Sequence, residues 1–247
     1  MPLILHIPHS STYIPDDHHK YYLMPVDELR NETLVAADIF TDELFDPDIP
    51  GLDKMVNTVS RLVMDPERFP DELESNFARG NGFYYTNTLT MGERIGRPLR
   101  QNDPNHKEQI HQMYKNYHEQ FEQKIKHLLD QYNKCIIIDC HSFGQSLVGL
   151  DDLPDFCIGT SPPQTPDYLY EAITKRLKNY NVAKDYPFCG SMIPGKYIGD
   201  ERVSTIMIEV NKWLYTDQEI HKSSNFNEIK TVLNEIICSV YEICTKS

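Results

Sequence analysis

Three residues that can take part in catalysis come at the ends of apolar runs in the chain. His9 follows "LILHIP", His141 follows "CIIIDC", and Glu209 interrupts "TIMIEV" near its end. A hydrolytic zinc site uses three protein ligands, commonly imidazoles and a carboxylate, and keeps one position open. Together the two histidines predict a site for one divalent metal ion, although each could instead be a hydrogen-bonded structural residue at a strand end.

The third ligand of such a site must come from another part of the chain. Asp38 lies in the stretch "VAADIFTDELF", and Asp42 and Glu43 of the same stretch are alternatives. Acidic residues are also common on helix surfaces, where they bind nothing. The residues alone leave this choice open.

Glu209 is unusual because a buried carboxylate without a partner is strongly disfavoured. In one interpretation the side chain faces solvent on an edge strand. In the other it lies beside a water molecule at the metal, where a general base must be within hydrogen-bond reach of the proton that it removes.

Arginines supply a further group. Arg61 and Arg68 flank Asp65 in "SRLVMDPERFPDE", and Arg97 and Arg100 belong to "GRPLR". Surface ion pairs would explain each arginine singly. Guanidinium groups also bind carboxylates through two parallel hydrogen bonds, so the cluster predicts a small anionic substrate.

These side chains require a fold that brings distant segments together. Apolar runs alternate with segments of helical periodicity, which predicts an α/β sheet with helices on both faces. Ligands bind beyond the carboxyl ends of the strands in such sheets, where His9, His141 and Glu209 would lie. We expect strands at 3–7, within 54–65, and at 135–138, 155–160 and 204–212, with helices at 27–45, 105–132, 166–180 and 227–244.

Composition narrows the class of protein. The 247 residues can bury one core, so we expect a single domain over 1–247. A formal charge of −13 argues against a nucleic-acid partner. No apolar run is long enough to span a bilayer, and the six cysteines lack CxxC spacing, so we expect no membrane association and a cytoplasmic location. The oligomeric state is not indicated.

Several motifs together resemble the N-formylglutamate amidohydrolase family. They are "HIPHSSTYIP", "AADIFTDELFD", "SRLVMDPERFPDE", "YKNYHEQF", "IIIDCHSF", "PDFCIGT", "PFCGSMIP" and "IMIEVNKWLY", and their order extends over nearly the whole chain. The resemblance implies a mixed, mostly parallel sheet flanked by helices, similar to the zinc carboxypeptidases and aspartoacylases. It also implies hydrolysis of N-formyl-L-glutamate to formate and L-glutamate, in histidine degradation, with one divalent metal, usually zinc.

The resemblance also implies roles for single residues. By it, His9, Asp38 and His141 look like metal ligands and Glu209 like the general base. By the same resemblance, Arg61 looks like a catalytic group that polarises the carbonyl, and Arg68, Arg100 and His118 look like substrate-binding residues.

Two departures from related enzymes bear on the site. Zinc carboxypeptidases carry a glutamate ligand three residues after the first histidine, where this chain has Thr12, so a carboxylate from elsewhere is needed. Glu67 stands where relatives often have asparagine.

Three alternatives to this function remain. The chain could act on another N-acyl amino acid or small peptide, or bind an acidic metabolite without hydrolysing it. A thiol hydrolase using Cys140 is disfavoured, because adjacent residues of a strand point to opposite faces and Cys140 could not easily share a proton with His141.

Overall fold

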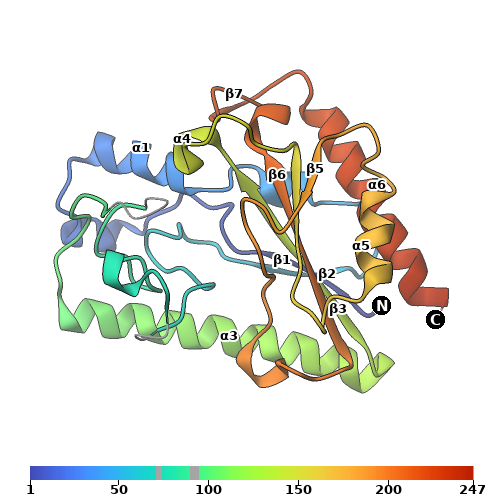
Figure 1. The fold of residues 1–247 in the computed structure, drawn as a ribbon. Coiled ribbons are helices and arrows are strands. Elements are labelled where there is room, and N and C mark those ends of the chain that lie inside the picture. The colour runs from blue at the N-terminus through green and yellow to red at the C-terminus, as the bar shows by residue number, and fades with distance from the viewer. Residues whose placement is uncertain (71–73, 90–94, 247) are drawn as a thin grey trace.

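The computed structural model describes residues 1–70, 74–89 and 95–246 and contains one large sheet between helices (Figure 1). Its six strands lie in the order β2-β1-β3-β6-β4-β5. Neighbours run parallel except for β4, which is antiparallel to β6. The expected mixed, mostly parallel α/β sheet is confirmed. The strands of the sheet are β1 (Leu3–Ile7), β2 (Asp53–Val56), β3 (Cys135–Phe143), β4 (Phe156–Gly159), β5 (Val182–Lys184) and β6 (Val203–Asn211).

Helices cover both faces of the sheet, which explains why the central strands β3 and β6 are buried along almost their whole length. One core includes residues of α5 and α6 and the side chains of Ile136, Ile138 and Cys140. The other includes Ile137 and residues of α1 and α3. The helices are α1 (Val26–Ala36), α2 (Thr41–Leu44), α3 (Pro104–Tyr132), α4 (Gln145–Val148), α5 (Asp167–Thr174) and α6 (Phe226–Lys246). A small separate sheet pairs β7 (Thr216–Asp217) with β8 (His221–Lys222).

The long helix α3 agrees with the helix expected at 105–132. It begins with Pro104, and the Asp103 side chain accepts a hydrogen bond from the His106 amide, which satisfies one of the free N–H groups of the first turn. It ends at Tyr132, and the following residue, Asn133, adopts the left-handed conformation. An apolar stripe of this helix packs against the sheet; its buried residues are Ile110, Tyr117, Phe121, Ile125 and Leu128.

The single helix expected at 27–45 is wrong in one respect that matters for the site. Helix α1 ends at Ala36 and α2 begins at Thr41, so Asp38 lies in the break between them. The Asp38 amide donates to the His9 carbonyl (2.9 Å), and Phe40 has φ +66°, which is incompatible with a continuous helix.

Other elements also differ from those expected: β3 continues to Phe143, beyond the strand expected at 135–138. The strand within 54–65 stops at Val56, and the residues after it form turns. Helix α5 ends at Thr174 instead of continuing to 180. The short strand β5 was not expected. Among the described residues, no helix is long and apolar enough to cross a membrane.

Candidate metal centre

The two predicted histidines meet, as expected, at the carboxyl ends of neighbouring strands. β1 and β3 are paired in parallel, so His9, two residues beyond β1, lies beside His141 on β3. Their ring centroids are 5.1 Å apart, and both side chains are buried.

Asp38 lies on the Nδ1 side of both rings. Its Oδ2 is 3.0 Å from His141 Nδ1 and 3.6 Å from His9 Nδ1. Burial alone would raise the pKa of the Asp38 carboxyl, but hydrogen bonds from the histidines and their charge lower this pKa below its ordinary value. The rival acidic residues Asp42 and Glu43 are exposed on α2, and Glu43 pairs with Lys222, so neither reaches the histidines.

The opposite nitrogen of each ring contacts a different carboxylate. His9 Nε2 is 2.9 Å from Asp65 Oδ1, and His141 Nε2 is 3.0 Å from Asp139 Oδ1. Histidines that bind metals usually donate their second ring N–H to a carboxylate or carbonyl, which fixes the tautomer and the ring orientation. In both rings Nε2 faces an aspartate, which is the arrangement expected of a metal-binding histidine. Nδ1 of each ring faces Asp38.

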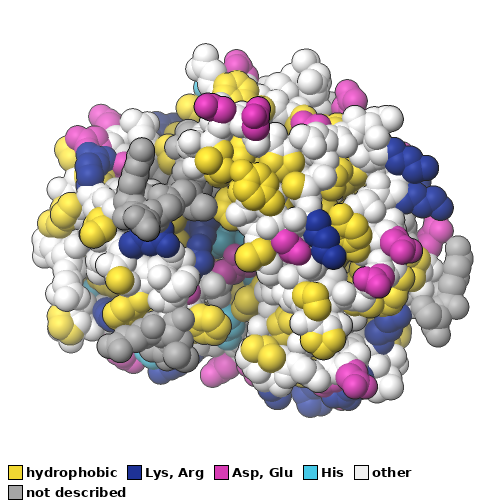
Figure 2. All heavy atoms as spheres, in the orientation of Figure 1, with side chains coloured by type: hydrophobic (Ala, Val, Ile, Leu, Met, Phe, Trp, Pro, Cys, Tyr) yellow, Lys and Arg dark blue, Asp and Glu magenta, His cyan; other side chains and the backbone are white. Residues whose placement is uncertain are grey.

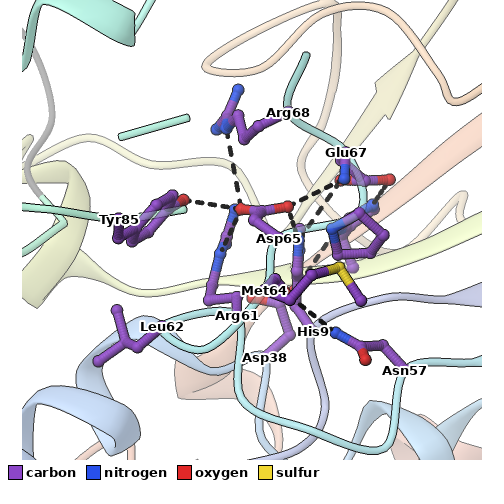
Figure 3. A network of polar contacts seen from close by, with 12 residues as sticks. His9, Asp38, Asn57, Arg61, Leu62, Met64, Asp65, Glu67, Arg68 and Tyr85 are labelled. Atoms are coloured by element: carbon purple, nitrogen blue, oxygen red, sulfur yellow. Dashed lines mark hydrogen bonds and ion pairs between the residues drawn. The ribbon is translucent and has the colours of Figure 1, made fainter. Parts of the chain in front are cut away.

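Asp65 is the centre of a buried polar network (Figure 3). Besides His9, its carboxylate accepts hydrogen bonds from Arg61 Nε (3.1 Å) and Nη2 (2.8 Å), from the Tyr85 hydroxyl (2.7 Å) and from the Glu67 amide (3.0 Å). Burial opposes its charge, but the positive charge of Arg61 lowers the pKa of Asp65 well below the ordinary value. Two donors of the predicted catalytic Arg61 are thus engaged by Asp65.

Glu209 is buried in the sheet beside the histidines and does not lie on an edge strand. Strand β6 is central, and its residue Glu209 pairs with His141 of β3. The side chain is 6% exposed, and its Oε2 has no hydrogen-bond partner. Burial, together with the negative charge of Asp38, raises the pKa of Glu209 to about 8, although the charge of His141 opposes the shift.

The two distances from Asp38 are compatible with a divalent metal on the Nδ1 side, but the trio His9, Asp38 and His141 is not among the groups of ligand atoms that lie within 4.8 Å of one another in the described part of the chain. His9 Nδ1 is buried without a hydrogen-bond partner, as is Glu209 Oε2. Ligands of a tetrahedral zinc ion are roughly 3.4 Å apart, and the two distances from Asp38 to the Nδ1 atoms lie on either side of that value.

Glu67 offers a second arrangement on the Nε2 side. Two groups of three residues each place one possible ligand atom per residue within 4.8 Å of one another. The first is His9, Glu67 and His141, and the second is His6, Glu67 and Asp139. Glu67 Oε1 is 3.2 Å from His141 Nε2, and its Oε2 is 3.7 Å from His9 Nε2. However, each of these Nε2 atoms already has a closer aspartate partner.

A cavity of about 520 Å³ opens next to these carboxylates, and Glu67, Arg68 and Asp139 line it. This volume suits a small ligand. Figure 2 shows a groove in the middle of one face of the molecule, with acidic, basic and histidine side chains visible inside it. Another cavity of about 530 Å³ has Leu34, Val35, Trp213 and Ile220 in its wall and contains none of the predicted site residues.

The other predicted substrate-binding residues differ in their surroundings. The Arg68 side chain is 29% exposed, and its guanidinium lies 3.8 Å from both Asp65 and Glu74. Arg100 is buried, with its guanidinium over the rings of Tyr84 and Tyr22. Its nitrogens approach the Val63 carbonyl at 3.4 Å.

His118 supports the loop that carries Glu67. Its Nε2 lies 2.9 Å from the Pro66 carbonyl, and burial lowers its pKa. Of the three predicted substrate-binding residues, Arg68 is the one that lines the cavity beside the centre.

Comparison with known proteins agrees with this architecture. Residues 1–216 match the model of the N-formylglutamate amidohydrolase family. The chain belongs to this family. No curated protein sequence matches it significantly.

Two crystal structures share the fold. One is the N-formylglutamate amidohydrolase from Ralstonia eutropha JMP134, with a TM-score of 0.81 and 18% identity over 99% of this chain and 94% of that one. The other is a gene product from Agrobacterium tumefaciens, with a TM-score of 0.69 and 16% identity over 98% of this chain and 91% of that one.

Sequence reasoning about this N-formylglutamate amidohydrolase family member missed the residues that orient the histidines. Asp65 and Asp139 contact them directly. A signal for Asp139 was present, because it follows four apolar residues of β3 and is two positions before His141, on the same face. The contact of Asp65 with His9 depends on how the turns after β2 fold back, which no local pattern indicates. Cys140 packs in the opposite core, as expected, and burial raises its pKa well above the ordinary value.

Proposed function

We propose that the chain is a metal-dependent amidohydrolase that removes the formyl group from N-formyl-L-glutamate or a closely similar N-acyl amino acid. The products would be formate and the free amino acid. The proposal rests mainly on one juxtaposition: two buried histidines share an aspartate at their Nδ1 atoms, and an unpaired, buried glutamate stands beside them. Family membership supports the choice of reaction.

His9, Asp38 and His141 are the proposed ligands of the metal, with zinc as the expected ion. Asp65 and Asp139 would hold the two imidazoles in the required orientation by accepting their Nε2 protons. When bound, a divalent metal would polarise the amide carbonyl and lower the pKa of its bound water to roughly 7.

Glu209 is the proposed general base. Its unpaired Oε2 can accept the proton of the attacking water, and the resulting carboxylic acid can deliver that proton to the departing amine nitrogen. In the protein alone its carboxyl keeps a proton at neutral pH, since its pKa is about 8. A nearby cation favours the ionised form, so the base would be generated only in the loaded site.

Arg68 is the proposed partner of a substrate carboxylate, because its guanidinium lines the cavity and has only long contacts with carboxylates of the protein. Arg61, which was predicted to be catalytic, would contribute to the reaction only indirectly. Through Asp65 it would fix the His9 ring. Arg100 and His118 would support the Val63 and Pro66 carbonyls of the same loop.

Metal analysis and an assay of formate release test this function together. The purified chain should contain or take up close to one divalent metal per molecule, and it should release formate from N-formyl-L-glutamate. Chelation should abolish turnover, and added metal should restore it. Comparison with N-acetyl- and N-succinyl-L-glutamate defines the acyl group. Binding of these compounds without hydrolysis, unaffected by chelation, would instead indicate a non-catalytic binding protein.

A further inference from the structure

The backbone of Asp38 is held by hydrogen bonds with His9 and Thr41. The Asp38 amide donates to the carbonyl of His9, and the Asp38 carbonyl accepts hydrogen bonds from the amide and the hydroxyl of Thr41. These bonds hold the backbone of Asp38. They do not reach the two carbonyls that flank it, those of Ala37 and Ile39.

Two buried side chains from a distant segment bind these flanking carbonyls. Lys212 Nζ donates to the Ala37 carbonyl (2.7 Å), and the Tyr215 hydroxyl donates to the Ile39 carbonyl (3.0 Å). Lys212 is 1% exposed, and Tyr215 is fully buried. We call this pair of donors the Lys212–Tyr215 clamp.

A lysine in this position costs free energy that an apolar residue of similar length would not. Lysine is almost never fully buried unless it is paired. Burial lowers the pKa of Lys212, while the negative charges of Asp38 and Glu219 act in the opposite direction. The Lys212 ammonium group thus satisfies the buried Ala37 carbonyl, and the charge of Asp38 favours its protonated form. A requirement for accurate placement of Asp38 explains why a lysine is buried here and why it binds the Ala37 carbonyl.

The clamp also connects Asp38 to the strand of the proposed base. Lys212 begins the 3₁₀ helix Lys212–Leu214 directly after β6, and Tyr215 follows that helix. Glu209 lies in β6, three residues before Lys212. A displacement of the end of β6 would thus move the backbone on both sides of Asp38.

We infer that Lys212 and Tyr215 are positioning residues that hold the Asp38 carboxylate against His9 and His141 and couple it mechanically to the strand bearing Glu209. The inference rests on the proposed function, in which Asp38 is a metal ligand. Neither residue is expected to contact the substrate.

Two variants separate this role from a general contribution to folding. Lys212→Met keeps the length of the side chain but removes the donor and its charge, and Tyr215→Phe removes only the hydroxyl. Exposed residues provide matched controls: Lys175→Met at the end of α5 and Tyr132→Phe at the end of α3. Tyr215→Phe keeps the test informative if Lys212→Met does not fold.

The first measurement needs no metal. Amide hydrogen exchange of peptides covering residues 36–41, followed by mass spectrometry in chelator, should be several-fold faster in both clamp variants than in the wild type and the controls. Unchanged exchange in the clamp variants would overturn the inference, whatever the metal does.

The second measurement is metal affinity, by competition with a chromophoric chelator, together with the visible spectrum of the Co²⁺ form. We expect binding to weaken roughly 10- to 100-fold, as for other outer partners of metal ligands. The Co²⁺ spectrum should change, and saturating metal should restore much of kcat at an unchanged KM. Wild-type affinity in variants with faster exchange would overturn the positioning role. Absence of metal binding by the wild type would overturn the proposed function alone. The hydrogen-exchange comparison in chelator would still decide whether Lys212 and Tyr215 hold the backbone around Asp38.

Discussion

His141 and Glu209 lie directly opposite each other on adjacent parallel strands, where the register of β3 and β6 pairs their Cα atoms. Both side chains are buried on the face of the sheet that carries the site. Because successive side chains of a strand alternate between faces, a slip of one residue would send Glu209 into the opposite core. The register of two central strands therefore fixes the proposed base relative to a proposed ligand.

Replacement of Glu209 with Gln should lower kcat by roughly 10²- to 10⁴-fold, the usual contribution of a general base, while the metal content stays near that of the wild type. The amide is similar in size to the carboxyl group but cannot accept the proton of water. Formate release and metal analysis on the same preparation check this. Full turnover in the variant would exclude Glu209 from the chemistry.

Asp38→Asn and Glu67→Gln distinguish the two possible ligand sets. If Asp38 binds the metal from the Nδ1 side, Asp38→Asn should weaken metal binding by more than the roughly 10- to 100-fold seen for outer partners, and Glu67→Gln should weaken it by less. Titration with a competing chelator measures both. The reverse order would assign the third ligand to Glu67.

The stability of the metal-free protein should depend on pH through Glu209. Burial raises its pKa from an ordinary value of 4.5 to about 8, so the folded state binds the proton more tightly than the unfolded state does. This contribution to the free energy of unfolding is complete below pH 4.5 and is lost as the pH rises through 8. Urea unfolding in chelator at pH 5, 6.5 and 8.5 should show the wild type losing stability relative to Glu209→Gln. Parallel pH profiles of the two proteins would contradict the raised pKa.

Arg68→Gln should raise KM for an N-formyl amino acid by roughly 10- to 100-fold, because a hydrogen bond to a charged group contributes about 1.5–3 kcal/mol. Asp65 keeps its bonds to Arg61 and Tyr85, so folding and metal content should change little. Arg97→Gln is the matched control, since Arg97 is exposed and pairs with Glu28 and Glu32. An equal effect of the two substitutions on KM would remove Arg68 from substrate binding.

The pattern of apolar residues along the sequence predicted those helices and strands that are stabilised mainly by contacts between residues close in sequence. The helix at 105–132 was clear because its apolar stripe repeats every three or four residues, and strand 3–7 was clear because it is apolar except for His6. The helix expected at 27–45 failed at Asp38, where a hydrogen bond to the distant His9 carbonyl replaces the helical one. Long-range contacts of this kind leave no local signal.

The sequence by itself determined which side chains end the apolar strands, and therefore that His9, His141 and Glu209 would gather at one edge of a sheet, because parallel strands present their carboxyl ends together. Only the tertiary structure decided which acidic residues surround them. Asp38 is buried beside both rings while Asp42 is exposed, and Asp65 orients His9 from a turn 56 positions away in the chain. A carboxylate is stable in such a place only when several distant groups neutralise and bind it, and that condition exists only after the chain has folded.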